Sequence, residues 1–107
     1  MNVIEVEVCR EAMTVSLVRD AGGVFIRVAL PDSDGSSALF PTNTSILHSF
    51  TKGFSYQVAS SEGSLAVSWD DPCVVFRFES TGLSAKRCRI EKAVFEESLS
   101  RFSSSTV

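Results

Sequence analysis

The chain has 107 residues, of which 44% are hydrophobic and 21% are charged, and its net charge at pH 7 is −3. A chain of this length is expected to form one domain around a single core. The acidic balance excludes the strongly basic class of nucleic-acid-binding proteins, so any contact with nucleic acid would depend on a local cluster of cations.

Three cysteines, Cys9, Cys73 and Cys88, occur without a CxxC spacing. An odd number without that spacing argues against a disulfide framework and against a thiolate zinc site. We expect small buried thiols in an intracellular, reducing compartment, with cytoplasm, nucleus and mitochondrion not distinguished. No hydrophobic run approaches the about 18 residues of a membrane span, and the N-terminal residues lack a signal-peptide pattern.

Hydrophobic and polar residues alternate over three stretches of the first half, residues 2–8, 13–18 and 24–30. Such alternation is typical of strands with one buried face. The sequence DAGG, residues 20–23, predicts a tight turn between the second and third stretches, because glycine supplies the backbone conformation that a tight reversal needs.

A polar loop at residues 31–37 leads into a short predicted strand, SALF, at residues 37–40. The next residues, 41–44, offer the side chains that begin helices, and Gly53 predicts the end of this helix. Its expected buried side chains are Ile46, Leu47 and Phe50.

The second half of the sequence repeats this order of elements. Residues 4–17 align with 56–69 at an offset of 52, and residues 24–40 align with 74–90 at an offset of 50. The agreement lies in the pattern of hydrophobic residues more than in identical letters. The alignment nevertheless predicts that four strands and a helix occur twice.

Two further expectations concern the second copy. The alignment places Trp69 on Leu17 at an inward position, which predicts a core side chain. The last predicted helix, EKAVFEESLSRF, has one hydrophobic face. That face is formed by Val94, Phe95, Leu99 and Phe102.

We therefore expect an α+β fold in a single domain, residues 1–107, built from two ββββα repeats. Repeat one covers about residues 1–52 and repeat two about residues 53–103, and a tail at 104–107 is expected to fray. Two antiparallel four-stranded sheets would cover their hydrophobic faces with helices and pack as an intertwined pseudo-dimer. Two copies are too few for a solenoid.

The segment GGVFIRVALPDSDGSSALFPTNTSILHSF resembles a PUR repeat, the ββββα unit of the Pur-alpha single-stranded nucleic-acid-binding proteins. The third strand of that unit opens with a motif close to G-R-F-L-K-I, and Val24 here replaces its basic residue. In the second half Arg77 and the aliphatic spacing remain, while Cys73 stands in place of the glycine. A Whirly-like fold shares the same general arrangement. The matching residues are Gly23, Phe25, Ile26, Arg27 and Val28.

The resemblance implies that the sheets bind single-stranded DNA or RNA. Family members use a basic and an aromatic residue of the third strand, together with polar and basic residues of the preceding hairpin. Phe25 and Arg27 match the first pair, and Arg77 matches the basic residue of the second copy. In the hairpin VRDAGG only Arg19 is basic, and Asp20 occupies the place of an asparagine.

The residues of the second half support the same chemistry independently of any family. Because Cys88 and Ile90 are expected to point inward, alternation places Arg87 and Arg89 outward, on the same face as Arg77. Guanidinium groups bind phosphates bidentately and also stack on bases.

The first half offers a weaker case. Its outward face carries Glu5 and Glu7, which would repel phosphate and neutralise Arg27 across the strands. Outward arginines also have an ordinary interpretation as a solvated sheet face, and Phe25 has one as a packing residue.

No catalytic constellation is present in the sequence, and neither a cofactor nor a metal is expected. There is no glycine-rich phosphate loop and no nucleophile elbow, and His48 is the single histidine. Turn chemistry explains the adjacent aspartates Asp70 and Asp71.

We expect a non-enzymatic, PUR-like binder of single-stranded RNA or DNA, with no membrane partner. The alternative is a protein–protein interaction or dimerisation module of the same fold within a larger complex, which the acidic composition and the glutamates favour. The residues expected to bind nucleic acid are Arg19, Phe25, Arg27, Arg77, Arg87 and Arg89.

Overall fold

The computed structural model describes residues 3–31, 37–82 and 84–104, so most of the predicted loop at 31–37 and residues 105–107 of the predicted tail lie outside it. The elements in chain order are β1 (Ile4–Arg10), β2 (Thr14–Asp20), β3 (Gly23–Ala29), β4 (Ser37–Thr42), α1 (Thr44–Ser49), the 3-10 helix η1 (Phe50–Lys52), β5 (Tyr56–Ser60), β6 (Gly63–Asp70), β7 (Cys73–Glu79), β8 (Lys86–Glu91) and α2 (Lys92–Ser104). Ser104 therefore belongs to α2 and not to the tail.

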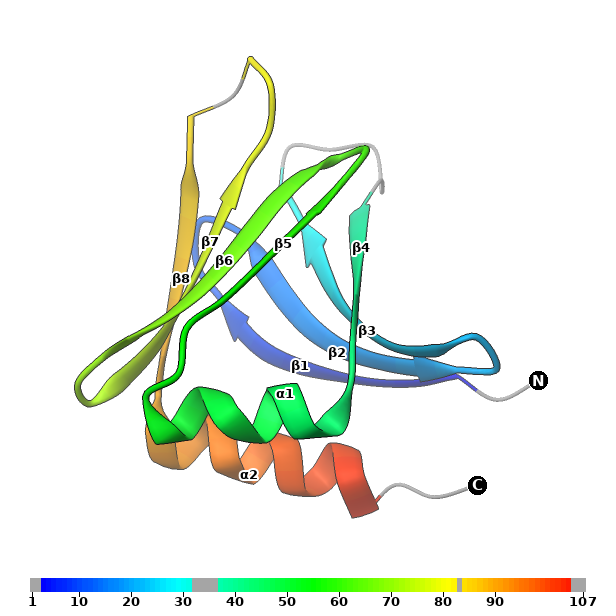
Figure 1. Cartoon of the computed structure of the whole chain (residues 1–107), viewed down its shortest axis with the longest axis vertical. Coiled ribbons are helices and arrows are strands. Elements are labelled where there is room, and N and C mark those ends of the chain that lie inside the picture. The colour runs from blue at the N-terminus through cyan, green and yellow to red at the C-terminus, as the bar shows by residue number, and fades with distance from the viewer. Residues whose placement is uncertain (1–2, 32–36, 83, 105–107) are drawn as a thin grey trace.

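Two antiparallel four-stranded sheets confirm the predicted α+β class. Sheet 1 has the order β1-β2-β3-β4 and sheet 2 the order β5-β6-β7-β8. The sheets pack at an angle with α1 and α2 side by side along one end of the pair (Figure 1). The edge strand β1 lies beside β8, and β4 lies beside β5.

The inner faces of both sheets and the helices enclose one core. Phe50, which follows α1, packs on Phe76 of β7 and on Phe95 of α2, with ring centres 6.2 and 6.0 Å apart. Phe40 of β4 meets Phe78 of β7 edge to face at 6.0 Å. Aromatic pairs at these separations add stability beyond the area that they bury. The core is therefore shared between the two halves of the chain.

The first helix begins and ends at the predicted residues. The Asn43 side chain accepts a hydrogen bond of 2.9 Å from the Ile46 N–H, as an N-cap residue does. The 3-10 turn η1 continues α1 to Gly53, whose φ of 87° is a conformation that other residues rarely adopt.

In α2 the buried face is narrower than predicted. Phe95, Leu99 and Phe102 are almost completely buried, but 48% of Val94 is exposed. The reason is helical spacing, because residues at positions i, i+4 and i+7 share one face and Val94 lies beside it.

The strand register corrects the alignment of the two halves. Leu17 pairs with Ile26, and fifty residues further on Val67 pairs with Phe76. The offset over the second and third strands is therefore 50, and the first strands follow it as far as the β1 bulge between Glu7 and Cys9. The offset of 52 predicted for the first two strands is wrong. The β2–β3 and β6–β7 turns are equally long, since Asp20 faces Gly23 across the first turn as Asp70 faces Cys73 across the second.

The fourth strands correspond at yet another offset. Arg27 faces Leu39, whereas Arg77 faces Arg87, so β4 and β8 correspond at an offset of 48. The connection between β7 and β8 is accordingly shorter than that between β3 and β4, and the offset of 50 predicted for the fourth strands is wrong.

Trp69 lies on the inner face of sheet 2, where it is partly buried against the core. Its inward position confirms the prediction. The corrected offset, however, makes Arg19 its counterpart in sheet 1, in place of Leu17.

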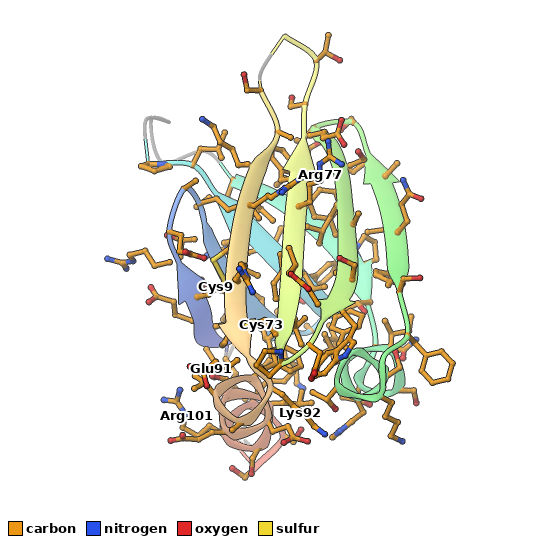
Figure 2. The ribbon with its side chains drawn as sticks, turned by 90° about the vertical axis from the view of Figure 1, so that its left-hand side faces the viewer. Cys9, Cys73, Arg77, Glu91, Lys92 and Arg101 are labelled. Carbon is orange, nitrogen blue, oxygen red and sulfur yellow. A yellow bond between two sulfur atoms is a disulfide. The ribbon has the colours of Figure 1, made fainter. Side chains whose placement is uncertain are left out.

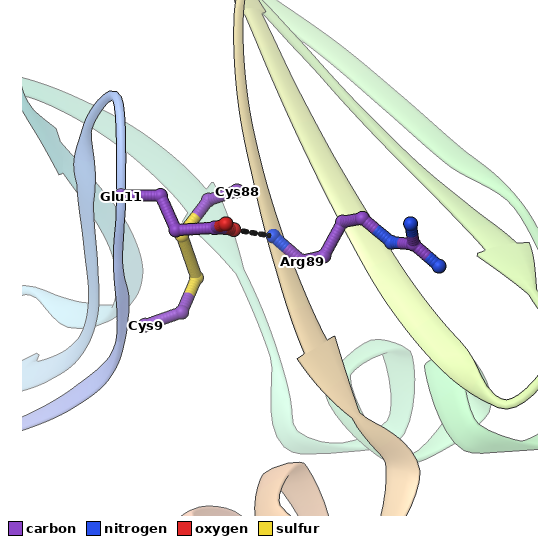
Figure 3. The surroundings of a disulfide bond; sticks show 4 residues. All are labelled: Cys9, Glu11, Cys88 and Arg89. Atoms are coloured by element: carbon purple, nitrogen blue, oxygen red, sulfur yellow. Dashed lines mark hydrogen bonds between the residues drawn. A yellow bond between two sulfur atoms is a disulfide. The ribbon is translucent and has the colours of Figure 1, made fainter.

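Cys9 of β1 and Cys88 of β8 form a disulfide that joins the two sheets (Figure 3). The expectation of three unpaired thiols is therefore wrong, and the pairing is at odds with a reducing compartment; Cys73 is free. Within the described ranges, no helix is long and hydrophobic enough to cross a membrane.

Candidate nucleic-acid interface

The outer face of sheet 2 carries three exposed arginines on adjacent strands, Arg77 on β7 and Arg87 and Arg89 on β8. Cys88 and Ile90 between and beside them point inward and are 0% and 6% exposed, which confirms the predicted alternation. Figure 2 looks onto this face and shows Arg77 projecting from β7. We call these three residues the arginine cluster.

Arg77 and Arg87 lie directly opposite each other in the ladder between β7 and β8. The Arg89 N–H donates to Glu11 Oε1 at 2.5 Å and so points away from β7 (Figure 3). N–H groups alternate in direction along a strand, so the Arg87 N–H also points away from β7. Arg87 and Arg77 therefore form a non-hydrogen-bonded pair, in which the Cα atoms approach to about 4.5 Å. Like charges in such a pair repel each other.

Carboxylates lie at both ends of the arginine cluster. Arg77 Nη2 is 3.4 Å from Glu79 Oε1, and Arg89 Nη2 is 3.6 Å from Asp70 Oδ2. All four side chains are about half exposed or more, and ion pairs of this kind contribute little net stability. Among the described residues no ion pair involves Arg87. A phosphate group would therefore displace only weak interactions.

Beside the arginine cluster, this outer face carries mostly short side chains, and no aromatic side chain lies on it in the part of the chain that the structure describes. The strands β5 and β6 contribute short side chains beside the arginines. Bases lying on this face would stack on guanidinium planes and on Val75, which lies between Ser68 and Arg89 in the ladder. The short side chains are Ala59, Ser64, Ala66 and Ser68.

The outer face of sheet 1 is electrostatically neutralised. Arg27 Nη1 lies 2.7 Å from Glu5 Oε1, and Arg10 Nη2 lies 2.6 Å from Glu7 Oε1. Both pairs border an open groove of about 580 Å³ on this face. The predicted neutralisation of Arg27 by a glutamate across the strands is thus present.

Phe25 is on the same outer face but is half-buried. It lies opposite Val18, which is only 2% exposed. Its ring reaches back over the β2–β3 turn, since Phe25 Cζ is 3.9 Å from where a side chain at Gly22 would begin. Phe25 therefore covers part of sheet 1 and offers less than a free ring for stacking.

Arg19 is not on an outer face. It alternates with Val18 along β2, and its guanidinium carbon lies 4.8 Å from the centre of the Phe102 ring of α2. A cation over an aromatic face at this distance is attracted by the ring. The structure thus joins three of the six predicted residues on sheet 2, places Phe25 and Arg27 on sheet 1, and separates Arg19 from both.

Sequence reasoning missed two features of the site. One is the opposition of Arg77 and Arg87, which depends on the length of the β7–β8 connection. The other is Glu11, which binds the edge of β8 from the β1–β2 turn. A pairing of Cys9 with Cys88 would have brought Glu11 close to β8, but the odd number of cysteines argued against any disulfide.

Comparison with protein-family models, with curated proteins and with solved structures finds no match for this chain. The similarity to a PUR repeat or to a Whirly-like fold stays a prediction. The candidate site therefore depends on the geometry described above.

Proposed function

We propose that the chain is a non-enzymatic binder of single-stranded nucleic acid and that it binds on the outer face of sheet 2. The observation that carries this proposal is the direct opposition of Arg77 and Arg87, with Arg89 beside them. Guanidinium groups held together in this way are destabilised by mutual repulsion, and a polyanion between them relieves it.

The mechanism is phosphate binding combined with stacking. Arg87 and Arg89 are two residues apart on one strand, a spacing of roughly 7 Å, so that they reach different phosphates of an extended strand. Each guanidinium binds phosphate oxygens bidentately, while Glu79 and Asp70 are released to water. The bases rest on Val75 and on the arginine planes, which favours unpaired over paired nucleotides.

We also propose that the two halves are duplicated ββββα units intertwined as a pseudo-dimer. Two observations support this. The ladders correspond at an offset of 50 over the second and third strands and over the first strand as far as the bulge after Glu7. The helical segments also reach across the halves, because Phe50 packs on Phe76 and Phe102 packs under Arg19.

A second candidate function is a protein–protein or dimerisation module of the same fold. The outer face of sheet 1 favours it, because its charges are paired and Leu39 there is 38% exposed. Light scattering across a range of protein concentrations tests self-association. A dimer that Leu39→Asp dissociates would support this candidate.

The test of nucleic-acid binding is a polarisation titration of short fluorescent single strands at low salt. We expect the wild-type chain to bind and Arg77→Ala with Arg87→Ala to weaken binding by at least about tenfold, as lost phosphate contacts do. Arg10→Ala with Lys52→Ala removes the same charge from exposed sites elsewhere and serves as the control. Absence of wild-type binding, or equal losses in both pairs, would contradict the proposal.

A further inference from the structure

Arg27 and Arg77 occupy corresponding places in the two sheets. Each lies on the third strand of its sheet, fifty residues apart in the sequence, and each faces a short side chain of the second strand, Ser16 and Ala66 respectively. Both outer faces therefore present a guanidinium group at the same position. The difference between the faces lies in the residues around it.

The environments of these two arginines differ because β1 carries two carboxylates. Glu5 binds Arg27 at 2.7 Å, and Glu7 lies opposite Ser16 in the same row of the ladder as Arg27. At the offset of 50, the position of Glu7 is taken by Gln57 and that of Glu5 by Ser55. The first strand is thus acidic in sheet 1 and neutral in sheet 2.

The surroundings of Arg27 have room for an anion. The groove over Arg27 has a volume of about 580 Å³ and opens to solvent. The Nε atom of Arg27 is buried and has no hydrogen-bond partner among the described residues. Apart from the charged pairs Arg27–Glu5 and Arg10–Glu7, the lining is small or polar and would not obstruct a phosphate: Thr14, Ser16, Ala29 and Ser37.

We propose that the outer face of sheet 1 is a second phosphate-binding site that Glu5 and Glu7 hold closed. Glu5 occupies the guanidinium group of Arg27 and Glu7 that of Arg10, so both cations of the groove are already neutralised and a polyanion gains little there. Each chain consequently binds one single strand, and it does so on sheet 2. This inference rests on the proposed function and assigns Glu5 and Glu7 the role of selecting the sheet.

The experiment opens the closed face after sheet 2 has been disabled. In the Arg77→Ala, Arg87→Ala background, Glu5→Gln with Glu7→Gln should restore binding of a short single-stranded oligonucleotide by at least about tenfold. Adding Arg27→Ala should abolish the gain. With sheet 2 intact, the same two glutamine substitutions should raise the stoichiometry in native mass spectrometry from one oligonucleotide per chain to two.

The control changes the net charge equally at another place. Glu96→Gln with Glu97→Gln alters two exposed residues of α2 and should restore little binding. A gain no larger than that of the control, or one that survives Arg27→Ala, would overturn the inference while leaving binding by sheet 2 intact. Should the wild-type chain not bind but the opened variant bind through Arg27, the proposed function fails and the closure of sheet 1 stands.

Thermal melting of each variant shows whether its fold is retained. If Glu5→Gln with Glu7→Gln does not fold, Glu5→Gln alone removes the ion pair to Arg27 and provides the same comparison. The single variant is expected to restore a smaller part of the binding, and no Arg27-dependent gain in it would again overturn the inference.

Discussion

Arg77 of β7 and Arg87 of β8 face each other across the ladder of sheet 2, in a pair whose side chains are as close as antiparallel strands allow. An opposite charge at either position would stabilise the sheet, whereas two guanidinium groups destabilise it. The fold therefore retains an unfavourable pair at the centre of an exposed face. The binding of a polyanion that we propose would relieve this repulsion.

Replacement of Arg87 should separate stability from binding. Arg87→Glu creates an opposite-charge pair with Arg77 and should raise the free energy of unfolding by about 0.2–1 kcal/mol. The same change places a carboxylate in the proposed phosphate site and should abolish binding. Urea unfolding and polarisation titration measure the two effects. Arg89→Glu is the control, because it places a second carboxylate near Asp70 and should not stabilise; a loss of stability in Arg87→Glu would argue against repulsion in the wild-type pair.

The two corresponding arginines should differ in their importance for binding. Arg77→Glu should weaken binding more than Arg27→Glu, because Glu5 already neutralises Arg27 at 2.7 Å. Titrations of both variants, after melting curves have shown that each is folded, provide the comparison. Affinities in the reverse order would contradict the assignment of binding to sheet 2.

The buried face of α2 should be essential for stability. Phe102→Ala and Leu99→Ala should each lower the free energy of unfolding by roughly 2–5 kcal/mol, as truncations of core side chains do. Val94→Ala is the matched control, since Val94 is 48% exposed and should change stability little. A midpoint of unfolding that stays the same in Phe102→Ala would mean that α2 does not pack as described.

The inter-sheet disulfide should stabilise the fold. Cys9 and Cys88 are 79 residues apart in sequence. Restricting an unfolded chain by a loop of that length is worth roughly 4 kcal/mol in the chain-entropy model. Urea unfolding of Cys9→Ala with Cys88→Ala should show a loss of that order, and Cys73→Ala should show little. If a reducing agent lowers the wild-type midpoint of unfolding to that of the double variant, the disulfide accounts for the difference in stability.

Gly63 should not tolerate a side chain. Its φ is +149°, and a Cβ atom there would collide with the Glu79 carbonyl oxygen. Gly63→Ala should therefore destabilise the chain by about 1–3 kcal/mol, because both the backbone conformation and the packing are disturbed. Gly53→Ala, which has a positive φ but open space around it, should cost less in thermal melting. Equal melting temperatures for the two variants would contradict this contact.

Alternation in the sequence predicted the faces of the strands correctly but not their alignment. Cys88 and Ile90 are inward as predicted, and this placed Arg87 and Arg89 outward. A shift by two residues keeps every side chain on its face, because the side-chain period of a strand is two. The pattern therefore could not distinguish an offset of 52 from one of 50, and the opposition of Arg77 and Arg87 was missed for the same reason.

Contacts between segments that are distant in the sequence could not be predicted either. Arg19 was expected near the hairpin surface, yet it lies over Phe102, a residue of the other half. The strand β2 extends through Arg19, so its side chain follows the inward alternation of Leu17. Which helix then covers that position depends on how the two halves pack, and local pattern does not encode this.

The most direct test maps the contact surface by nuclear magnetic resonance. A short single-stranded oligonucleotide is titrated into the 15N-labelled chain, and the amide signals are followed. We predict that shifts concentrate on β7 and β8, around Val75, Arg77, Arg87 and Arg89, with little change at Glu5 or in the helices. No shifts at low salt, or shifts gathered on sheet 1 or the helices, would contradict binding by the outer face of sheet 2.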